Sequence, residues 1–427
     1  MDLQLIASQA RSITFNMAVL PEKKKNELLL SLAVHLQKHK DDIMAANGKD
    51  LTESKRQGLE KPLLKRLVFD EKKINDVISG IRSLVNLPDP VGKILSETEL
   101  DTGLVLQQVT CPIGVIGVIF ESRPDALVQI SSLCLKSGNA VLLKGGAEAI
   151  HTNKILTDII KRISADAGLD PGWISLLETR DDVKEMLTLD DYIDLIIPRG
   201  SNDFVRYIID NSSIPVLGHA DGICHVYIDE KADLDMALRI AIDAKTQYVA
   251  VCNAMETLLV HNAIAPAFLP AFKKLCDIHH VSIRGCEKTR HFIDTLLATE
   301  EDWKTEYLDY IVSVKIVDTF EEAVDHINRY GSGHTDAIVT ADNFLADRFM
   351  NLVDSANVFH NCSTRFSDGY RYGLGAEVGI STNKIHARGP VGLEGLIIYK
   401  WKLRGQGHIV KDYADGIKNF CHKKRKI

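Results

Sequence analysis

The sequence predicts an α/β fold built around parallel sheets, and three observations support this prediction. From residue 113 onward, short apolar segments alternate with longer segments of helical periodicity. The apolar segments are almost continuous, as in the strands of a parallel sheet that helices cover on both faces. The chain has 427 residues, which is more than one hydrophobic core usually serves, so we expect two or three domains.

Residues 1–95 are predicted to be helical. Apolar residues recur there at intervals of three and four positions, and lysines occupy the opposite faces. Pro88, Pro90 and Gly92 end this region. The looser alternation from Glu97 to Thr110 favours a β-hairpin.

A first series of strands and helices follows the hairpin. Its predicted strands are Ile113–Phe120, Ala140–Leu143, Trp173–Leu177, Ile193–Ile197, Ile214–Leu217 and His225–Ile228, with helices such as Ala126–Lys136 and Thr152–Ala167 between them. Sheets of this kind bind ligands beyond the carboxyl ends of their strands.

A second series completes the predicted fold. Its strands are Thr257–His261, Tyr310–Val317, Ala337–Thr340 and Asn357–Phe359, and its helices are Pro266–Cys276 and Thr319–Arg329. The stretch from Arg365 onward is rich in glycine and contains another candidate strand at Leu393–Arg404.

Composition excludes several classes of protein. The net charge of −7 argues against nucleic acid or an anionic membrane as the main partner. The N-terminus lacks a secretory signal, and no apolar run reaches membrane-spanning length. The eight cysteines show no Cys-x-x-Cys spacing, and the pairs His35/His39 and His279/His280 have no third ligand. We therefore expect a cytoplasmic protein with reduced thiols, no metal, and a short frayed basic tail at Cys421–Ile427.

Cys252 is the most informative residue of the chain. It lies between an apolar, β-prone approach and a turn of small residues, directly before an apolar strand. If Asn253–Glu256 form a helical turn, free N–H groups and the positive end of a helix dipole face the sulfur and favour the thiolate. A nucleophilic cysteine is made in this way. The alternative is a small buried hydrophobic residue.

Three polar turns follow predicted strands. The turn with Ser122 and Arg123 carries a hydroxyl and a cation that suit an anionic substrate group, or else a surface salt bridge. Lys144-Gly145-Gly146 suits the binding of phosphate or ribose. Arg199-Gly200-Ser201 lies at the start of a predicted helix and forms a second candidate anion-binding site. The Gly-x-Gly-x-x-Gly fingerprint is absent. Two such seats on one sheet still suggest a dinucleotide facing a nucleophile on the next domain.

Two later segments are less specific. The stretch Tyr372–Gly379, which includes Gly375 and Ala376, offers backbone N–H groups to a carboxylate, with a plain turn as the alternative. His334 connects a helix to a strand, where a structural role is more frequent than a catalytic one.

Six motifs resemble γ-glutamyl phosphate reductases, a family of the aldehyde dehydrogenase superfamily. They are Pro112–Pro124, Pro198–Ser201, Cys252–Thr257, His334–Asp336, Gly373–Gly379 and Ser381–Glu394, and the likeness runs from about residue 5 to 410. The segment Pro215–His225 is also similar to the reductase half of the eukaryotic bifunctional proline-synthesis enzyme, whose kinase half is absent from this sequence.

The resemblance implies an aldehyde dehydrogenase-like fold. Residues 1–228, with 366–385, would form the NADP-binding domain and its N-terminal helices, and residues 229–365 the cysteine domain. Residues 97–111 and 386–412 would form an oligomerisation arm, so a homo-oligomer is expected. Residues 413–427 would be a tail.

The resemblance also implies an activity. It is the NADPH-dependent reduction of L-glutamyl 5-phosphate to L-glutamate 5-semialdehyde and phosphate through a Cys252 thioester, the second step of proline biosynthesis from glutamate. The Cys252 N–H, with Asn253 or Arg123, would stabilise the oxyanion. The cofactor would lie on Lys144, Gly145, Gly146, Arg199, Gly200, Ser201 and Asp309, and the substrate on Ser122, Arg365, Gly375 and Ala376. Association with a glutamate 5-kinase stays open.

Two departures from oxidising aldehyde dehydrogenases are chemically informative. Val216 takes the place of the glutamate that activates water in those enzymes, so a thioester should survive until hydride arrives. Ala147 takes the place of a glutamate that enzymes preferring NAD often carry. Its absence leaves room for a 2′-phosphate and points to NADPH.

Two rival functions remain. An aldehyde dehydrogenase that acylates CoA also keeps a thioester, and consumption of CoA separates it from a reductase. A non-catalytic subunit that binds a glutamate kinase would not oxidise NADPH, and the intact Cys252 with both phosphate seats argues against it.

Overall fold

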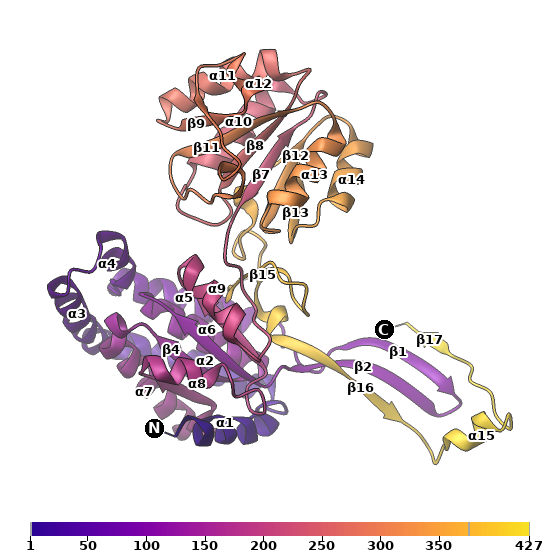
Figure 1. Ribbon diagram of the computed structural model, residues 1–427. Coiled ribbons are helices and arrows are strands. Elements are labelled where there is room, and N and C mark those ends of the chain that lie inside the picture. The colour runs from indigo at the N-terminus through magenta and orange to yellow at the C-terminus, as the bar shows by residue number, and fades with distance from the viewer. Residues whose placement is uncertain (1, 375, 427) are drawn as a thin grey trace.

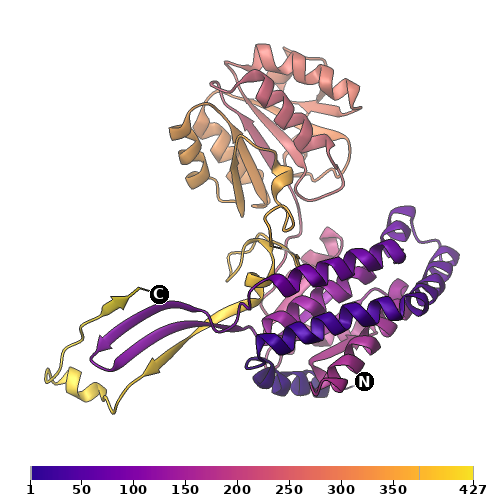
Figure 2. The same cartoon turned by 180° about the vertical axis from the view of Figure 1, so that it is seen from behind.

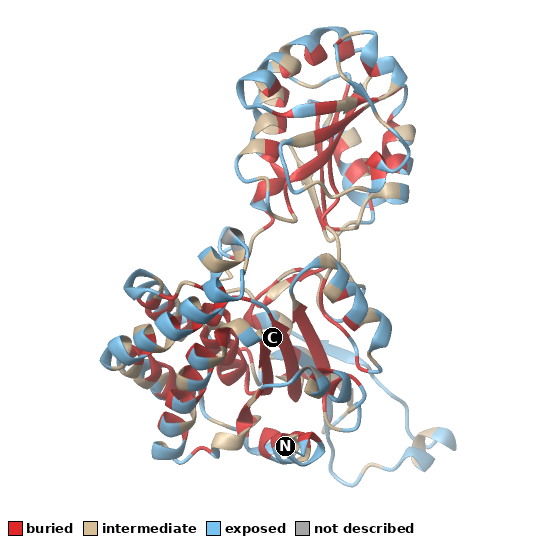
Figure 3. Ribbon diagram, turned by 60° about the vertical axis from the view of Figure 1, so that its left-hand side comes forward, coloured by how far each residue is buried: buried red, intermediate tan, exposed pale blue. Residues whose placement is uncertain are grey.

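The structure is a computed structural model that describes residues 2–374 and 376–426. It contains two α/β bodies, one built on a four-stranded sheet and one on a seven-stranded sheet, and a β arm that projects from the first (Figure 1). We call them the four-stranded body, the seven-stranded body and the arm. Most strands of the two bodies are buried (Figure 3).

The N-terminal helices pack over the four-stranded body (Figure 2). They are α1 (Leu3–Met17), α2 (Glu22–Lys38), α3 (Lys40–Arg56), α4 (Lys61–Leu67) and α5 (Glu71–Asn86). Side-chain carboxylates cap two of them, because Asp2 accepts from the Leu5 N–H at 3.0 Å and Asp70 from the Lys73 N–H at 2.9 Å. The helical prediction for residues 1–95 is confirmed as far as Asn86, but its last residues are wrong, because strand β1 begins at Ile94.

The four-stranded sheet is parallel and has the order β5-β4-β3-β6. Its strands are β3 (Val115–Phe120), β4 (Ala140–Gly145), β5 (Ile174–Leu177) and β6 (Leu195–Arg199). The connecting helices are α6 (Pro124–Ser137), η1 (Ala147–Ala149), α7 (Ile150–Asp166), η2 (Pro171–Trp173), α8 (Arg180–Met186) and α9 (Asn202–Asn211). Phe120 pairs with both Gly145 and Arg199, so the carboxyl ends of β3, β4 and β6 lie side by side.

One predicted strand of this sheet does not form. Residues 214–217 contribute only an isolated bridge between Val216 and Ile196. Ile214, Val216 and Leu217 are buried, but Pro215 between them is exposed and has no N–H for a ladder hydrogen bond.

The seven-stranded sheet is parallel and has the order β10-β9-β11-β8-β7-β12-β13. Its strands are β7 (Cys224–Ile228), β8 (Met255–His261), β9 (Ser282–Gly285), β10 (Leu296–Leu297), β11 (Ile311–Val317), β12 (Thr335–Val339) and β13 (Asn357–His360). Its helices are α10 (Leu234–Thr246), α11 (Ala265–Ile278), α12 (Glu287–Arg290), η3 (Asp302–Lys304), α13 (Phe320–Tyr330), α14 (Asn343–Leu352) and η4 (Thr364–Phe366).

The position of β7 corrects the domain boundary expected at residue 228. β7 pairs with β8 and β12 and therefore belongs to the seven-stranded body. All five of its residues are buried, and such a strand fits either sheet equally well. Its sequence could not show which sheet it joins.

The arm is an antiparallel sheet of order β16-β2-β1-β17. Its strands are β1 (Ile94–Asp101), β2 (Leu104–Pro112), β16 (Ile397–Arg404) and β17 (Lys423–Arg425), with helix α15 (Val410–Ala414) at its end. The remaining elements, β14 (Gly379–Ser381), β15 (Gly389–Val391) and η5 (Leu393–Leu396), lead into it. The predicted hairpin and the predicted strand near 393–404 are confirmed.

The C-terminal tail is not frayed over its described residues, which corrects the expectation. Strand β17 pairs with β1, where Arg425 forms ion pairs with Glu97 at 3.2 Å and Glu99 at 3.1 Å. The basic residues of the tail thus lie opposite acidic residues of the hairpin. Attraction between opposite charges on the two strands stabilises the pairing of β17 with β1.

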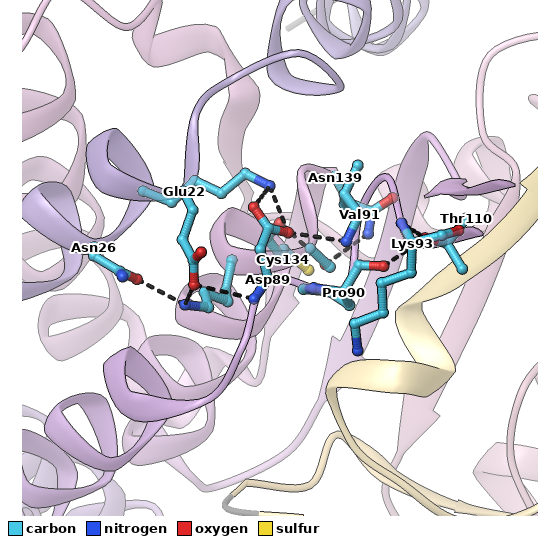
Figure 4. A network of polar contacts seen from close by, with 12 residues as sticks. Glu22, Asn26, Asp89, Pro90, Val91, Lys93, Thr110, Cys134 and Asn139 are labelled. Atoms are coloured by element: carbon cyan, nitrogen blue, oxygen red, sulfur yellow. Dashed lines mark hydrogen bonds and ion pairs between the residues drawn. The ribbon is translucent and has the colours of Figure 1, made fainter. Parts of the chain in front are cut away.

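A polar network fixes the base of the arm against the helices (Figure 4). The buried Lys25 ammonium contacts the Asp89 carboxylate at 2.8 Å, and the Asp89 N–H donates to Glu22 at 3.1 Å. The Thr110 hydroxyl donates to the Pro90 carbonyl at 2.6 Å. These bonds hold the segment that follows α5 in place.

Candidate active site

Cys252 lies in a turn between α10 and β8, at the junction of the two bodies. It lines a cavity of about 460 Å³ whose wall includes residues of α5, α6 and β6 as well as residues 365–380. The turn runs from Val251 to Ala254, closed by a 3.0 Å hydrogen bond. Strand β8 already begins at Met255, so the expected helical turn over 253–256 is wrong.

The electrostatics at the sulfur follow from this geometry. Burial raises the pKa of Cys252 to about 12, and the nearby carboxylates of Glu306 and Glu377 act in the same direction. The Arg199 guanidinium partly opposes them. No helix N-terminus faces the sulfur, so the condition under which a thiolate was expected is not met.

Three arginines line the same cavity, and all three were predicted as site residues. Arg199 ends β6, Arg123 precedes α6, and Arg365 lies in η4. Arg123 pairs with Asp125 at 2.9 Å, and Arg365 Nε donates to Gln247 at 2.9 Å. The structure thus brings three guanidinium groups from both bodies to one thiol, an arrangement suited to a phosphate or carboxylate.

Two carboxylates near the thiol were missed by sequence reasoning. Glu377 lines the cavity and accepts from the Gly369 N–H at 2.7 Å, and Glu306 accepts from Asn202. Burial raises the pKa of both. Asp309, predicted to contact the cofactor ribose, is exposed, and its carboxylate accepts from the Tyr310 N–H at 2.7 Å. No pattern in the segment Glu306–Asp309 shows which acid faces inward.

The predicted oxyanion and carboxylate donors are partly engaged. Asn253 is buried in the cavity wall and its Nδ2 donates to the Ser367 carbonyl at 2.7 Å. Ala376 also lines the cavity, but its N–H donates to the Leu374 carbonyl at 2.9 Å. A bound carboxylate would have to displace that bond. Gly375 lies outside the described residues.

The predicted cofactor residues gather at the carboxyl edge of the four-stranded sheet. Lys144 is buried and its Nζ donates to the Gly145 carbonyl at 2.6 Å. The Ser201 N–H donates to Glu121 at 3.2 Å. A Cβ on Gly200 would lie 2.7 Å from the Glu121 carboxylate. At this edge, where the strand order reverses, glycine backbone lies close to the buried Lys144. Such an arrangement suits the binding of a dinucleotide.

Ser122 lies next to this edge and not in the cavity wall. Its backbone φ is +47°, and both its N–H and its hydroxyl donate to the Glu148 carboxylate, at 2.6 and 2.8 Å. A Cβ on Gly146 would come within 2.0 Å of the same carboxylate. Ser122 therefore orients Glu148, and its role as a substrate ligand stays a prediction.

The fold and the site together define a class: a two-body α/β enzyme with a cysteine at the junction and a dinucleotide-type edge on one sheet. The aldehyde dehydrogenase family model matches residues 1–282. The gamma-glutamyl phosphate reductases of Acetivibrio thermocellus and Pelotomaculum thermopropionicum are each 63% identical over 424 residues, covering 99% of this chain and 98% of each relative. The chain therefore belongs to the aldehyde dehydrogenase family and is an oxidoreductase.

A solved structure agrees with this assignment. The crystal structure of gamma-glutamyl phosphate reductase from Thermotoga maritima is 38% identical, with a TM-score of 0.94, and the match covers 96% of this chain and 100% of that one. The resemblance that the motifs predicted and the aldehyde dehydrogenase-like fold are both confirmed. Among the described residues, none of the helices combines the length and the apolar character needed to span a membrane.

Replacement of Gly222 by alanine is expected to lower the oxidoreductase activity by about 100-fold or more. A Cβ at this position would lie 2.2 Å from the Cys252 carbonyl oxygen and 2.4 Å from its Cα, so the turn that carries the thiol must shift. A displacement of about 1 Å at a reacting group can cost about 10²-fold. Steady-state kinetics, with circular dichroism to verify folding, measure the effect. Gly48→Ala in α3, where a Cβ meets nothing within 4 Å, is the control, and full activity of Gly222→Ala would contradict the close approach.

Alkylation of Cys252 by iodoacetamide is expected to accelerate about tenfold per pH unit between about pH 7 and 9, because the reactive thiolate is a small fraction below the raised pKa. Glu306→Gln removes one of the charges that raise this pKa, so its alkylation at a given pH should be faster, by up to about tenfold for a one-unit fall. Asp309→Asn, at an exposed position, should change nothing. Peptide mass spectrometry gives the rates. A plateau below about pH 8 would indicate a stabilised thiolate.

Proposed function

We propose that the protein reduces L-glutamyl 5-phosphate to L-glutamate 5-semialdehyde and phosphate with NADPH, the second step of proline biosynthesis from glutamate. The observation that carries the proposal is the Cys252 thiol in a cavity lined by Arg123, Arg199 and Arg365. The relatives named gamma-glutamyl phosphate reductase, at 63% identity over nearly the whole chain, support the same reaction.

The charges of the cavity match those of this substrate. L-Glutamyl 5-phosphate carries a phosphate, a carboxylate and an ammonium group. Besides the three guanidinium groups, the carboxylates of Asp76, Asp368 and Glu377 line the cavity. Guanidinium groups bind phosphate and carboxylate, and carboxylates bind ammonium, so each group of the substrate has a complement.

The first chemical step uses residues of this chain. The Cys252 sulfur attacks the acyl carbon and forms a C–S bond, and the C–O bond to phosphate breaks. The thiol loses its proton to solvent, and phosphate leaves with the bonding electrons, held by the arginines. The Cys252 N–H and the second N–H of the Asn253 amide would stabilise the oxyanion between these events. The product is a Cys252 thioester.

The thioester must persist until it is reduced. Val216, buried in the position where oxidising relatives carry a glutamate, offers no base to activate water. Asp76, Asp368 and Glu377 also place carboxylates in the cavity wall, and that of Glu377 is held by the Gly369 N–H. The phosphate dependence of the reverse reaction, described below, shows whether water reaches the thioester or is excluded from it.

NADPH would bind on Lys144, Gly145, Gly146, Arg199, Gly200 and Ser201, and when bound it supplies the hydride that reduces the acyl group. Preference for NADPH over NADH is supported by the environment of Ala147. This residue carries no carboxylate, and the neighbouring Glu148 carboxylate is engaged by Ser122. Asp309 is exposed, and its role toward the cofactor ribose stays a prediction.

The reverse reaction tests the proposal, because the acyl phosphate is too unstable to supply. The protein is mixed with L-glutamate 5-semialdehyde, NADP⁺ and phosphate, and the absorbance of reduced nicotinamide is followed. Strictly phosphate-dependent reduction is expected. Reduction without phosphate would mean that water reaches the thioester, and a requirement for CoA would favour the CoA-acylating alternative. No reduction with any acceptor would refute the enzyme activity proposed.

The arm supports the expected homo-oligomer. Its edge strand β16 exposes Ile398, Tyr399, Trp401 and Leu403, and an exposed apolar edge strand is a template for pairing with another chain. Light scattering at several protein concentrations tests this, and a monomer at micromolar concentration would refute it. Co-elution with a glutamate 5-kinase tests the second predicted partner.

A further inference from the structure

Two histidines that are distant in the sequence meet at the Cys252 thiol. His219 lies in the segment before β7, and His334 lies directly before β12. One ligand atom from each histidine and the Cys252 sulfur all lie within 4.8 Å of one another. The two imidazole rings are arranged edge to face, with centroids 4.9 Å apart.

Both imidazoles are already oriented through Nδ1. In His219 this atom bonds to the Ile380 carbonyl oxygen at 2.8 Å, and in His334 to the Thr335 hydroxyl at 2.8 Å. Metal-binding histidines are held in this way, with one nitrogen on an oxygen and the other turned to the metal.

The second nitrogen of His334 is an unsatisfied group. His334 is fully buried, and its Nε2 has no hydrogen-bond partner among the described residues. An unsatisfied buried polar atom costs free energy. When Nδ1 carries the ring proton and donates it to Thr335, Nε2 presents a lone pair, and such a nitrogen is a ligand for a transition-metal ion.

We propose that His219, Cys252 and His334 bind one Zn²⁺ ion that reversibly blocks the nucleophile. Two imidazole nitrogens and one thiolate form a donor set that zinc favours. Metal–ligand bonds of about 2.0–2.3 Å require the three atoms to approach by roughly 1 Å from the distances found here. On binding, a Zn–S bond forms, the thiol proton is released to solvent, and the sulfur can no longer attack an acyl carbon.

Three protein ligands leave the fourth zinc position to water. Cys224 does not fill it, because its thiol donates to the Cys252 carbonyl oxygen at 3.2 Å. Structural zinc sites usually have four protein ligands. The site is therefore an exchangeable, inhibitory one. Only the inhibition rests on the proposed function; the binding itself does not.

Cobalt(II) replaces zinc as the probe of binding, since its thiolate complexes absorb in the near ultraviolet. Titration of the metal-free full chain with Co²⁺ is expected to give a thiolate-to-cobalt charge-transfer band that saturates at one equivalent. Cys252→Ser should abolish the band. His219→Ala should weaken binding at least tenfold, because loss of even an outer-shell partner of a ligand costs about 10–100-fold. Cys421→Ser, at the most exposed cysteine, should leave the band unchanged.

His334 is fully buried, so its replacement can unfold the chain, and a second measurement uses the unchanged protein. Zn²⁺ should protect Cys252 from iodoacetamide, as read by peptide mass spectrometry, while Cys421 in the same sample stays reactive. Equal labelling of Cys252 with and without Zn²⁺, or cobalt binding without the charge-transfer band, would overturn the proposal.

The two proposals fail separately. Phosphate-dependent reductase activity without a charge-transfer band would refute the metal site and leave the proposed function intact. A saturating band in a protein that has no reductase activity would refute the proposed function and support the site.

Discussion

Replacement of Cys252 by alanine is expected to lower phosphate-dependent NADP⁺ reduction by at least about 10⁴-fold, as when a covalent nucleophile is removed from an enzyme. The loss follows from the composition of the cavity. Cys252 is the only cysteine in the described wall of the cavity, and the remaining lining groups are guanidinium, carboxylate, amide, hydroxyl and apolar side chains. None of them forms a thioester.

The variant should still bind NADPH, because its predicted site lies on the four-stranded body. Fluorescence titration of NADPH measures this binding separately from turnover. Cys286→Ser is the matched control, since Cys286 is also a half-buried cysteine of the seven-stranded body but does not line the cavity. Residual activity above about 1% in Cys252→Ala would contradict covalent catalysis through this residue.

Replacement of Lys245 by methionine is expected to lower the free energy of unfolding by about 3–5 kcal/mol, the usual cost of breaking a buried ion pair. Lys245 in α10 contacts Glu256 in β8 at 2.6 Å, and both side chains are fully buried. Burial raises the pKa of Glu256 to about 7 even with the lysine present. Without the lysine this pKa rises further. Urea denaturation measures the loss.

The sign of the pH dependence follows from that pKa. A carboxyl group whose pKa is higher in the folded than in the unfolded chain binds more protons in the folded state. In Lys245→Met, Glu256 is such a group, so the free energy of unfolding falls as the pH rises above the pKa that Glu256 has in the unfolded chain. Lys245→Met should therefore be closer to wild type at pH 5 than at pH 8. A second substitution, Glu256→Gln, removes the unpaired charge and should restore most of the stability.

Lys231→Met gives the exposed counterpart. Lys231 pairs with Asp342 at 2.8 Å, but its side chain is 57% exposed, so its loss should cost far less stability than the loss of Lys245. If Lys245→Met cost less than about 1 kcal/mol, water would have to reach the buried pair.

The positions of the strands and helices could be predicted from the sequence better than the sheet that each strand joins. Strands β3, β4, β8 and β11 were predicted because runs of valine, isoleucine and leucine are typical of parallel sheets. The sheet that β7 joins depends on contacts made after the chain crosses between the bodies. The pairing of β17 with β1 depends on opposite charges more than 300 positions apart, as in the hydrogen bond of Arg425 with Glu97 across 328 positions.

In the candidate site, too, some residues could be predicted from local sequence patterns and others could not. Cys252, Arg123 and Arg199 were predicted because each lies next to a strand, where a local pattern shows it. His219 and His334 were not predicted, because metal-type spacing was sought within short segments. Five strands, β7 to β11, and four α-helices, α10 to α13, separate these two residues in the sequence. The signal that could have found Gly222 was its place in His219-Ala-Asp-Gly222, which has no side chain where the nucleophile's backbone must pass.

The arm joins the two ends of the chain, and this determines when it can fold. Tyr413 donates to Asp101 across 312 positions, and β2 is completed only by β16. Contacts between such distant residues require closure of a long loop and form slowly. During synthesis, the edge of β2 in the hairpin β1–β2 therefore stays unpaired until nearly the whole protein has left the ribosome. A chain stopped before residue 397 would keep both α/β bodies but present that edge, and aggregation is the outcome expected for it.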